Sequence, residues 1–178
     1  MLLTISGLPG SGTTTVAKLL AEHYSVGMVS AGEVFRRLAE ERALTLAEFG
    51  ALAESDPSID LDIDKLQKEI ANTSDNLILE GRLTGHMVDE GLKVWIKAPI
   101  DVRVKRIAVR ENAPIDEMLD GTIKREASES IRYKGIYGID IGDMSIYDII
   151  IDSNRWDQYE IAKIIATSID VLGGFGCH

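Results

Sequence analysis

The sequence is short of cysteine, histidine and long apolar runs, and each shortage excludes a class of protein. Cys177 stands alone, which excludes an intrachain disulfide, and the three histidines are too scattered for a zinc site. No apolar stretch approaches the roughly 20 residues that cross a bilayer. The first residues lack the basic flank and small-residue cleavage site of a secretory signal. We therefore expect a cytoplasmic protein that has no membrane partner.

Lysine and arginine are also in deficit, with 19 of them against 29 aspartates and glutamates, for a net charge of −10. This balance argues against a nucleic-acid partner. The basic residues nevertheless gather in one region, because five arginines fall within residues 103–132. They are Arg103, Arg106, Arg110, Arg125 and Arg132. Two interpretations remain open: the cluster binds a small polyanion, or the arginines lie on solvated helix faces and pair with nearby acids.

A glycine-rich stretch near the N-terminus has the spacing of a phosphate-binding loop. It reads Gly-Leu-Pro-Gly-Ser-Gly-Thr-Thr over residues 7–14, after a β-branched run and before an apolar-periodic segment. Backbone N–H groups of such a loop, at the start of a helix, bind phosphate oxygens without a charged side chain. Thr13 occupies the position where lysine is usual, and Thr14 has the hydroxyl expected to ligate magnesium. The residues expected to bind the phosphoryl donor are Gly7, Leu8, Pro9, Gly10, Ser11, Gly12, Thr13, Thr14 and Thr15.

The 178 residues, 45% of them hydrophobic, suit one globular domain in which strands and helices alternate. Strands are expected at 2–5, 27–30, 76–80, 94–96 and 146–152. Helices are expected from the loop to about 24 and at 33–42, 44–54, 61–71, 100–111, 115–133 and 158–172. The alternation predicts an α/β fold of the P-loop NTPase type, with three α/β/α layers and a five-stranded parallel sheet. Sites in such sheets lie beyond the carboxyl ends of the strands, where Ser30 and Glu80 fall.

Four stretches, in this order, carry a resemblance that covers nearly the whole chain. They are the loop, Ser-Ala-Gly-Glu-Val-Phe-Arg at 30–36, Glu-Gly-Arg at 80–82, and the arginine-rich segment that ends at Arg132. Together they resemble the nucleoside monophosphate kinases, and most of all the archaeal-type cytidylate kinases. The resemblance implies that ATP, with magnesium, phosphorylates CMP to CDP. It also implies an acceptor-binding segment at about 31–75 and a lid at about 112–142, and we expect a monomer.

The resemblance gives arginines the central roles, because two polyanions have to meet at one site. Arg36 and Arg82 would hold the acceptor phosphate. Arg125 and Arg132 would belong to the lid that closes over the transferring phosphate. A guanidinium group suits these roles, because its fork matches phosphate oxygens bidentately and does not lose its proton.

Two further arginines match positions at which related kinases contact the donor. Arg106 and Arg110 would stack on the donor adenine and contact the donor phosphates. Arg103 falls outside this match, so we expect it to be an ordinary surface residue.

The acceptor pocket would be formed by Ser30, Gly32, Phe35, Asp60 and Gly81.

Several roles have two interpretations at this point. Glu80 either acts on magnesium through water or is a helix-cap or structural carboxylate. Asp60 either accepts a hydrogen bond from the cytosine amino group or caps the helix expected near residue 61. Thr13 either leaves the phosphate charge to the backbone and the arginines, or marks a nucleotide-binding regulator that does not catalyse. The acceptor, too, has alternatives: dCMP, UMP, AMP or another small metabolite.

Overall fold

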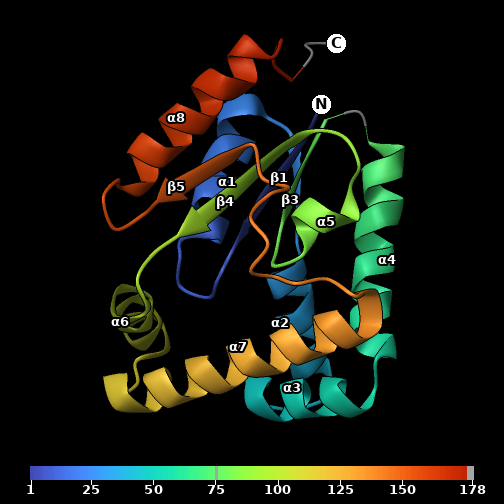
Figure 1. The fold of residues 1–178 in the computed structure, drawn as a ribbon, viewed down its shortest axis with the longest axis vertical. Helices are drawn as coiled ribbons and strands as arrows, with labels where there is room; N and C mark the ends of the chain where they lie inside the picture. The colour runs from blue at the N-terminus through green and yellow to red at the C-terminus, as the bar shows by residue number, and fades with distance from the viewer. Residues whose placement is uncertain (75, 176–178) are drawn as a thin grey trace.

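The computed structural model describes residues 1–74 and 76–175, which form a parallel sheet between two layers of helices (Figure 1). The strands are β1 (Leu2–Gly7), β2 (Gly27–Ser30), β3 (Leu77–Glu80), β4 (Leu92–Lys97) and β5 (Ile149–Asp152). The helices are α1 (Thr13–Tyr24), α2 (Ala31–Glu41), α3 (Leu46–Ser55), α4 (Ser58–Thr73), α5 (Thr84–Met87), α6 (Ile100–Glu111), α7 (Ile115–Tyr137) and α8 (Gln158–Val171). No helix in the described part of the chain is both long and apolar enough to cross a membrane.

The sheet has the strand order β2-β3-β1-β4-β5, and every neighbouring pair is parallel. Parallel neighbours need a crossover connection, which explains why helices separate the strands along the chain. Ile5 of the central strand β1 is in register with Glu80 of β3, which is in turn in register with Ser30 of β2. The strands therefore end at one edge of the sheet, where the loop after β1 begins. The prediction of a five-stranded parallel sheet is confirmed.

The main core lies between the sheet and the helices α1 and α8. Leu3 and Ile5 of β1 are fully buried, and α8 contributes Ile161, Ile165 and Ile169. Their four-residue spacing places these isoleucines on one face of α8, which forms a single apolar stripe against the sheet. Helices α4 and α5 cover the opposite face of the sheet (Figure 1).

Helices α2, α3 and α4 have a smaller core of their own beside the sheet. Phe49 of α3 is fully buried within it, and its ring centroid lies 4.6 Å from that of Phe35 of α2. Thr45 and Glu48 form a capping box that begins α3. Helix α7 runs across the lower end of the molecule and packs on α3 and α6 (Figure 1). The region 31–75 and α7 thus approach the carboxyl ends of the strands from two sides.

Some element boundaries differ from the sequence prediction. Strand β5 begins at Ile149 rather than at 146, because residues 145 and 146 lie in a turn. Helix α7 continues to Tyr137, and Gly138 ends it in the left-handed conformation with φ 70°. Helix α4 begins at Ser58 rather than at 61. The sequence pattern does not predict α5, because a single turn is too short to show a helical period.

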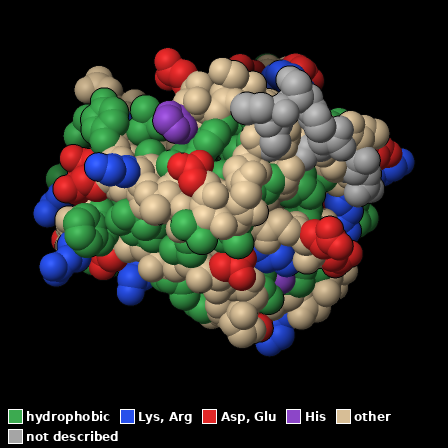
Figure 2. Space-filling view, turned by 90° about the horizontal axis from the view of Figure 1, so that it is seen from above, with side chains coloured by type: hydrophobic (Ala, Val, Ile, Leu, Met, Phe, Trp, Pro, Cys, Tyr) green, Lys and Arg blue, Asp and Glu red, His purple; other side chains and the backbone are tan. Residues whose placement is uncertain are grey.

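The end of the molecule that lies opposite α7 has a mixed surface. Figure 2 shows acidic, basic and hydrophobic side chains interspersed on this face.

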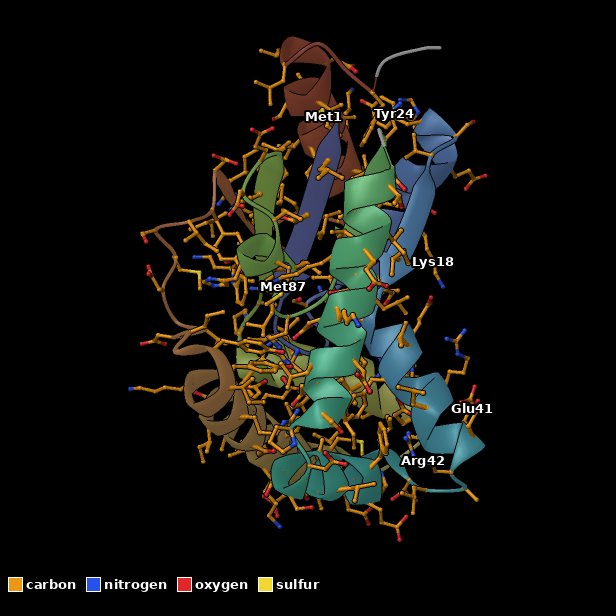
Figure 3. All side chains as sticks on the ribbon, turned by 90° about the vertical axis from the view of Figure 1, so that its right-hand side faces the viewer. Met1, Lys18, Tyr24, Glu41, Arg42 and Met87 are labelled. Atoms are coloured by element: carbon orange, nitrogen blue, oxygen red, sulfur yellow. The ribbon has the colours of Figure 1, made fainter. Side chains whose placement is uncertain are left out.

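Lys18 lies on the outer side of α1 (Figure 3), where its ammonium group is 2.8 Å from the Glu33 carboxylate. Cys177 lies outside the described residues. Of the five clustered arginines singled out in the sequence, all but Arg103 line the cavities described next.

Candidate active site

The loop between β1 and α1 has the backbone of an anion-binding loop. Gly10 and Gly12 have φ values of 81° and 98°, in the left-handed region that favours glycine. A Cβ atom on Gly10 would lie 2.6 Å from the carbonyl oxygen of Arg103, so no other residue fits there without movement. Gly12 precedes α1 and provides no side-chain cap, which leaves the first N–H groups of the helix available to a ligand.

Two cavities meet at this loop, with Gly10, Thr13, Thr14 and Arg110 lining both. The first cavity, of about 120 Å³, lies between the loop, the α2–α4 unit and α7. The predicted residues that line only this cavity are Gly7, Leu8, Pro9, Gly32, Phe35, Arg36, Asp60, Glu80, Gly81, Arg82, Arg125 and Arg132. The second cavity, of about 500 Å³, lies on the outer side of the loop. The predicted residues that line only the second are Ser11, Gly12, Thr15 and Arg106.

A buried carboxylate on α7 binds two of the cavity arginines. Glu129 Oε1 accepts a 2.7 Å hydrogen bond from Arg125 Nε, and Glu129 Oε2 lies 2.5 Å from Arg82 Nη2. Burial alone would raise the pKa of Glu129, but the charges of Arg82, Arg125 and Arg132 outweigh it and hold this pKa below its ordinary value. Glu129 is therefore ionised at neutral pH and fixes α7 against Arg82, which lies two residues after the end of β3.

Asp60 and Arg132 form a second ion pair between the helices α4 and α7. Arg132 Nε donates to Asp60 Oδ2 at 2.8 Å, and the side chains of both residues are buried. The prediction that Asp60 caps a helix is wrong, because α4 begins at Ser58 and Asp60 lies inside its first turn. Its carboxylate neutralises a guanidinium group from the opposite wall of the cavity instead.

Two cations of the cavity keep unused hydrogen-bonding capacity. Arg82 Nη1 is buried and has no hydrogen-bond partner among the described residues. Arg36 lines the same cavity and forms no ion pair within the described part of the chain. A buried charged donor without a partner costs stability, and this cost is recovered when a ligand supplies an acceptor. The pair therefore marks a position for an anion between β3 and α2.

Thr13 has a role that the sequence does not reveal. Its hydroxyl donates to Glu80 Oε1 at 2.6 Å, while Ser30 donates to Glu80 Oε2 at 2.5 Å. Glu80 caps none of the described helices, so the helix-cap interpretation is wrong, while its two hydrogen bonds agree with a structural carboxylate. Ser30 lines neither cavity, because its hydroxyl also accepts from the Glu33 N–H and caps α2. Each hydroxyl thus binds one oxygen of the Glu80 carboxylate, and together they fix its orientation.

Arg103 is buried, which corrects the prediction that it lies on the surface. Its Nε donates to the Ala98 carbonyl at 3.0 Å, and its Nη1 donates to the Pro9 carbonyl at 3.1 Å. The same Nη1 donates to the carboxylate of Glu126 on α7. Arg103 thus joins the phosphate-binding loop, α6 and α7. The sequence offered no signal for this, because helical spacing does not say which neighbour a face meets.

Replacing Arg103 with methionine is expected to lower the free energy of unfolding by about 3 kcal/mol, because a partly buried carboxylate and a loop carbonyl lose their donor. Chemical denaturation measures this change. Arg37→Met is the matched control: the Arg37 side chain is 65% exposed, and we expect a change of about 0.5 kcal/mol or less there. Equal effects of the two substitutions would contradict the role given to Arg103.

Arg106 and Arg110 both line the second cavity, because α6 places them one turn apart. Arg106 donates to Ser153 Oγ at 2.8 Å and to the Ser153 carbonyl at 2.7 Å, and Ser153 Oγ donates to the Ser11 carbonyl at 2.7 Å. Arg106 therefore ties the end of β5 to the loop. Arg110 pairs with Glu111 near the surface and borders both cavities.

A family model described as "Cytidylate kinase-like family" matches residues 2–155. The chain is 65% identical to the cytidylate kinase of Methanococcoides burtonii, with 98% of this chain and 100% of that protein covered. It is 57% identical to the cytidylate kinase of Methanosarcina acetivorans, with 98% and 99% covered.

Solved structures show the same fold at low sequence identity. An uncharacterized protein from Eubacterium ventriosum superimposes with a TM-score of 0.73 at 22% identity, covering 96% of this chain and 98% of that one. A shikimate kinase from Bacteroides thetaiotaomicron gives a TM-score of 0.61 at 16% identity, with the same coverage. These structural likenesses support a P-loop kinase fold. The family model and the similar sequences cover most of the chain and therefore also identify its family. The chain belongs to the cytidylate kinase-like family.

Proposed function

We propose that this protein transfers the γ-phosphoryl group of ATP to CMP, forming CDP and ADP. The observation that carries the proposal is the first cavity, in which Arg82 has an unpartnered buried donor opposite the phosphate-binding loop. An anion held there faces a second anion held by the loop. The curated relatives at 65% and 57% identity are named cytidylate kinases, which selects CMP among the monophosphates.

The two substrates would occupy different cavities. ATP would occupy the loop and the larger cavity, with Arg106 beside it, while CMP would occupy the smaller cavity with its phosphate on Arg36 and Arg82. Arg110 borders both cavities and is placed to contact the group in transfer. Phosphoryl transfer needs positioning and charge neutralisation more than covalent help from the protein. Arginines therefore supply the charge that Thr13 does not.

Magnesium suits the oxygen groups between the two cavities. Thr14 lines both cavities and its hydroxyl makes no hydrogen bond within the described residues, so it is free to ligate a cation. Glu80 lines the first cavity together with Thr14, and its carboxylate is held by Thr13 and Ser30. Mg²⁺ prefers such oxygen ligands and keeps several waters, so Glu80 would act through water. When bound, the ion would neutralise charge on the donor phosphates.

The region of α7 would act as the lid, over about 112–142, and the α2–α4 unit as the acceptor-binding segment, over about 31–75. The first cavity, at about 120 Å³, is smaller than the roughly 300 Å³ of a small ligand site. We therefore infer that α7 moves outward when CMP enters and returns to exclude water, which would otherwise hydrolyse ATP. Both half-sites lie within one chain, which supports a monomer, and we propose that it acts in the cytoplasm.

A panel of acceptors tests the function in one experiment. ADP release from ATP is followed with CMP, dCMP, UMP, AMP and a sugar. We expect kcat/KM for CMP to exceed that for UMP by about 100-fold or more, because a site built for one set of polar groups leaves them unpaired with the other. Equal rates with AMP or UMP would contradict a cytidylate preference. Tight ATP binding without any product would instead favour a nucleotide-binding regulator.

A further inference from the structure

One face of α4 lines the first cavity with polar side chains that phosphate binding does not use. Asp60, Asp64 and Gln67 are spaced by four and three residues, so they lie on one face of the helix, and they line the cavity together with Ile63. Figure 3 shows α4 standing in front of the sheet, beside α2 and above α3. Asp60 is committed to Arg132 by their ion pair. Asp64 and Gln67 are left to be explained.

Gln67 is a buried polar side chain without a partner. Its exposed fraction is 1%, and it forms no hydrogen bond with any described residue. Its Nε2 is completely buried, and the side chain borders the cavity. Buried amides are nearly always hydrogen-bonded in proteins, so one that faces a cavity indicates a ligand with polar atoms at that place. An amide group can offer two donors and one acceptor to that ligand.

Asp64 lies one helical turn away, and only one of its carboxylate oxygens has a hydrogen-bond partner among the described residues. Its Oδ2 accepts a hydrogen bond from the hydroxyl of Tyr137 on α7. Burial, supported by the charge of Asp60, raises the pKa of Asp64 to about 6, against the hydrogen bond from Tyr137 and the charge of Lys68. Above that pH the group is ionised and can only accept. Asp64 and Gln67 together thus present an acceptor beside a donor.

We propose that Asp64 and Gln67 read the base of the acceptor nucleotide and select cytosine over uracil. Asp64 accepts a hydrogen bond from the 4-amino group, and the Gln67 amide donates to the neighbouring ring nitrogen or carbonyl. Cytosine carries a donor at position 4 where uracil carries an acceptor, so uracil would set its carbonyl against the carboxylate. This inference rests on the proposed function. It assigns to Asp64 the contact that the sequence alone suggested for Asp60.

The first test compares kcat/KM for CMP and UMP in the wild type and in Asp64→Asn. An asparagine can turn its amide N–H toward a carbonyl, so we expect the CMP-to-UMP ratio to fall about 100-fold or more, with KM for ATP unchanged. Asp62→Asn is the matched control, because Asp62 is exposed on the same helix and lines neither cavity. Its ratio should equal that of the wild type. Equal losses with both acceptors in Asp64→Asn would overturn the proposal.

A second variant and a pH profile keep the test independent of any folding defect. Gln67→Glu removes the donors, and we expect KM for CMP to rise about 10-fold or more with kcat less affected. In the wild type, the CMP-to-UMP ratio should fall as pH drops through about 6. Protonated Asp64 gains an O–H group that can donate to the uracil carbonyl, and it is a weaker acceptor for the cytosine amino group. Taking the ratio cancels the titration of the acceptor phosphate, which also occurs near pH 6. Asp60 and Lys68 act directly on the pKa of Asp64. The other charged residues that line the same cavity are Arg36, Glu80, Arg82, Arg110, Arg125, Glu129 and Arg132.

The outcomes separate this inference from the proposed function. A wild-type enzyme that phosphorylates no CMP would contradict the function itself. The wild-type enzyme could instead prefer CMP while its CMP-to-UMP ratio stays constant from pH 8 to about 5 and is the same in Gln67→Glu. That result would contradict base recognition by Asp64 and Gln67 and leave the proposed function in place. Adenine also carries an amino group beside a ring nitrogen. Rejection of AMP should therefore depend on the size of the cavity and change little in Asp64→Asn.

Discussion

Arg82→Ala is expected to lower kcat/KM for CMP by about 10³-fold, the largest effect of any single arginine. The guanidinium group would make two charge-assisted hydrogen bonds to the acceptor phosphate, together about 4 kcal/mol, or roughly 10³-fold in rate. Its Nη1 is already buried and unpartnered, so no rearrangement is needed before it binds. Steady-state kinetics with varied CMP at saturating ATP measures the loss. Arg37→Ala, on the exposed side of α2, should leave the rate constant unchanged.

The same substitution removes a partner of Glu129, and a double variant separates the two consequences. Arg82→Ala leaves Glu129 buried with Arg125 as its remaining neighbour at 2.7 Å, which should cost about 2–3 kcal/mol of stability. Adding Glu129→Gln removes the uncompensated charge and should restore most of that stability. It should not restore kcat/KM. Recovery of activity in Arg82→Ala/Glu129→Gln would show that Arg82 acts on the fold and not on the substrate.

Glu80→Gln is expected to lower kcat about 100-fold and to raise the Mg²⁺ concentration for half-maximal activity by about 10- to 100-fold. A carboxylate that orders metal-bound water contributes metal affinity of this size. Glutamine keeps one oxygen for the Thr13 or Ser30 hydroxyl, which now donate at 2.6 and 2.5 Å. The free energy of unfolding should therefore fall by only about 1–2 kcal/mol.

A magnesium titration of ADP release, at saturating ATP and CMP, measures the effect of Glu80→Gln. Asp152→Asn is the control, because Asp152 ends β5 and its Oδ1 accepts from the Asn154 N–H at 2.9 Å in a turn. That variant should keep the wild-type magnesium dependence. An unchanged dependence in Glu80→Gln would mean that Glu80 serves only to hold Thr13 and Ser30 in place.

The sequence could place the clustered arginines on helix faces but could not predict what those faces contact. The spacing of Arg103, Arg106 and Arg110 is compatible with solvent, with acidic partners or with a polyanion, and each of the three has a different neighbourhood in the fold. Arg103 is buried against Pro9, and Arg110 is half exposed at the edge of both cavities. Spacing along one helix places residues on a face, but the packing of other helices decides what that face meets.

The sequence by itself determined the sheet, the phosphate-binding loop and the strand-end positions of Ser30 and Glu80. These follow from local patterns: apolar runs make buried strands, glycines allow the loop backbone, and parallel strands all end at one edge. Only the tertiary structure decided that Thr13 holds Glu80, that Asp60 pairs with Arg132, and that Gln67 is buried without a partner. These contacts join segments that lie far apart in the chain. Their energies depend on distance and burial, which no local pattern contains.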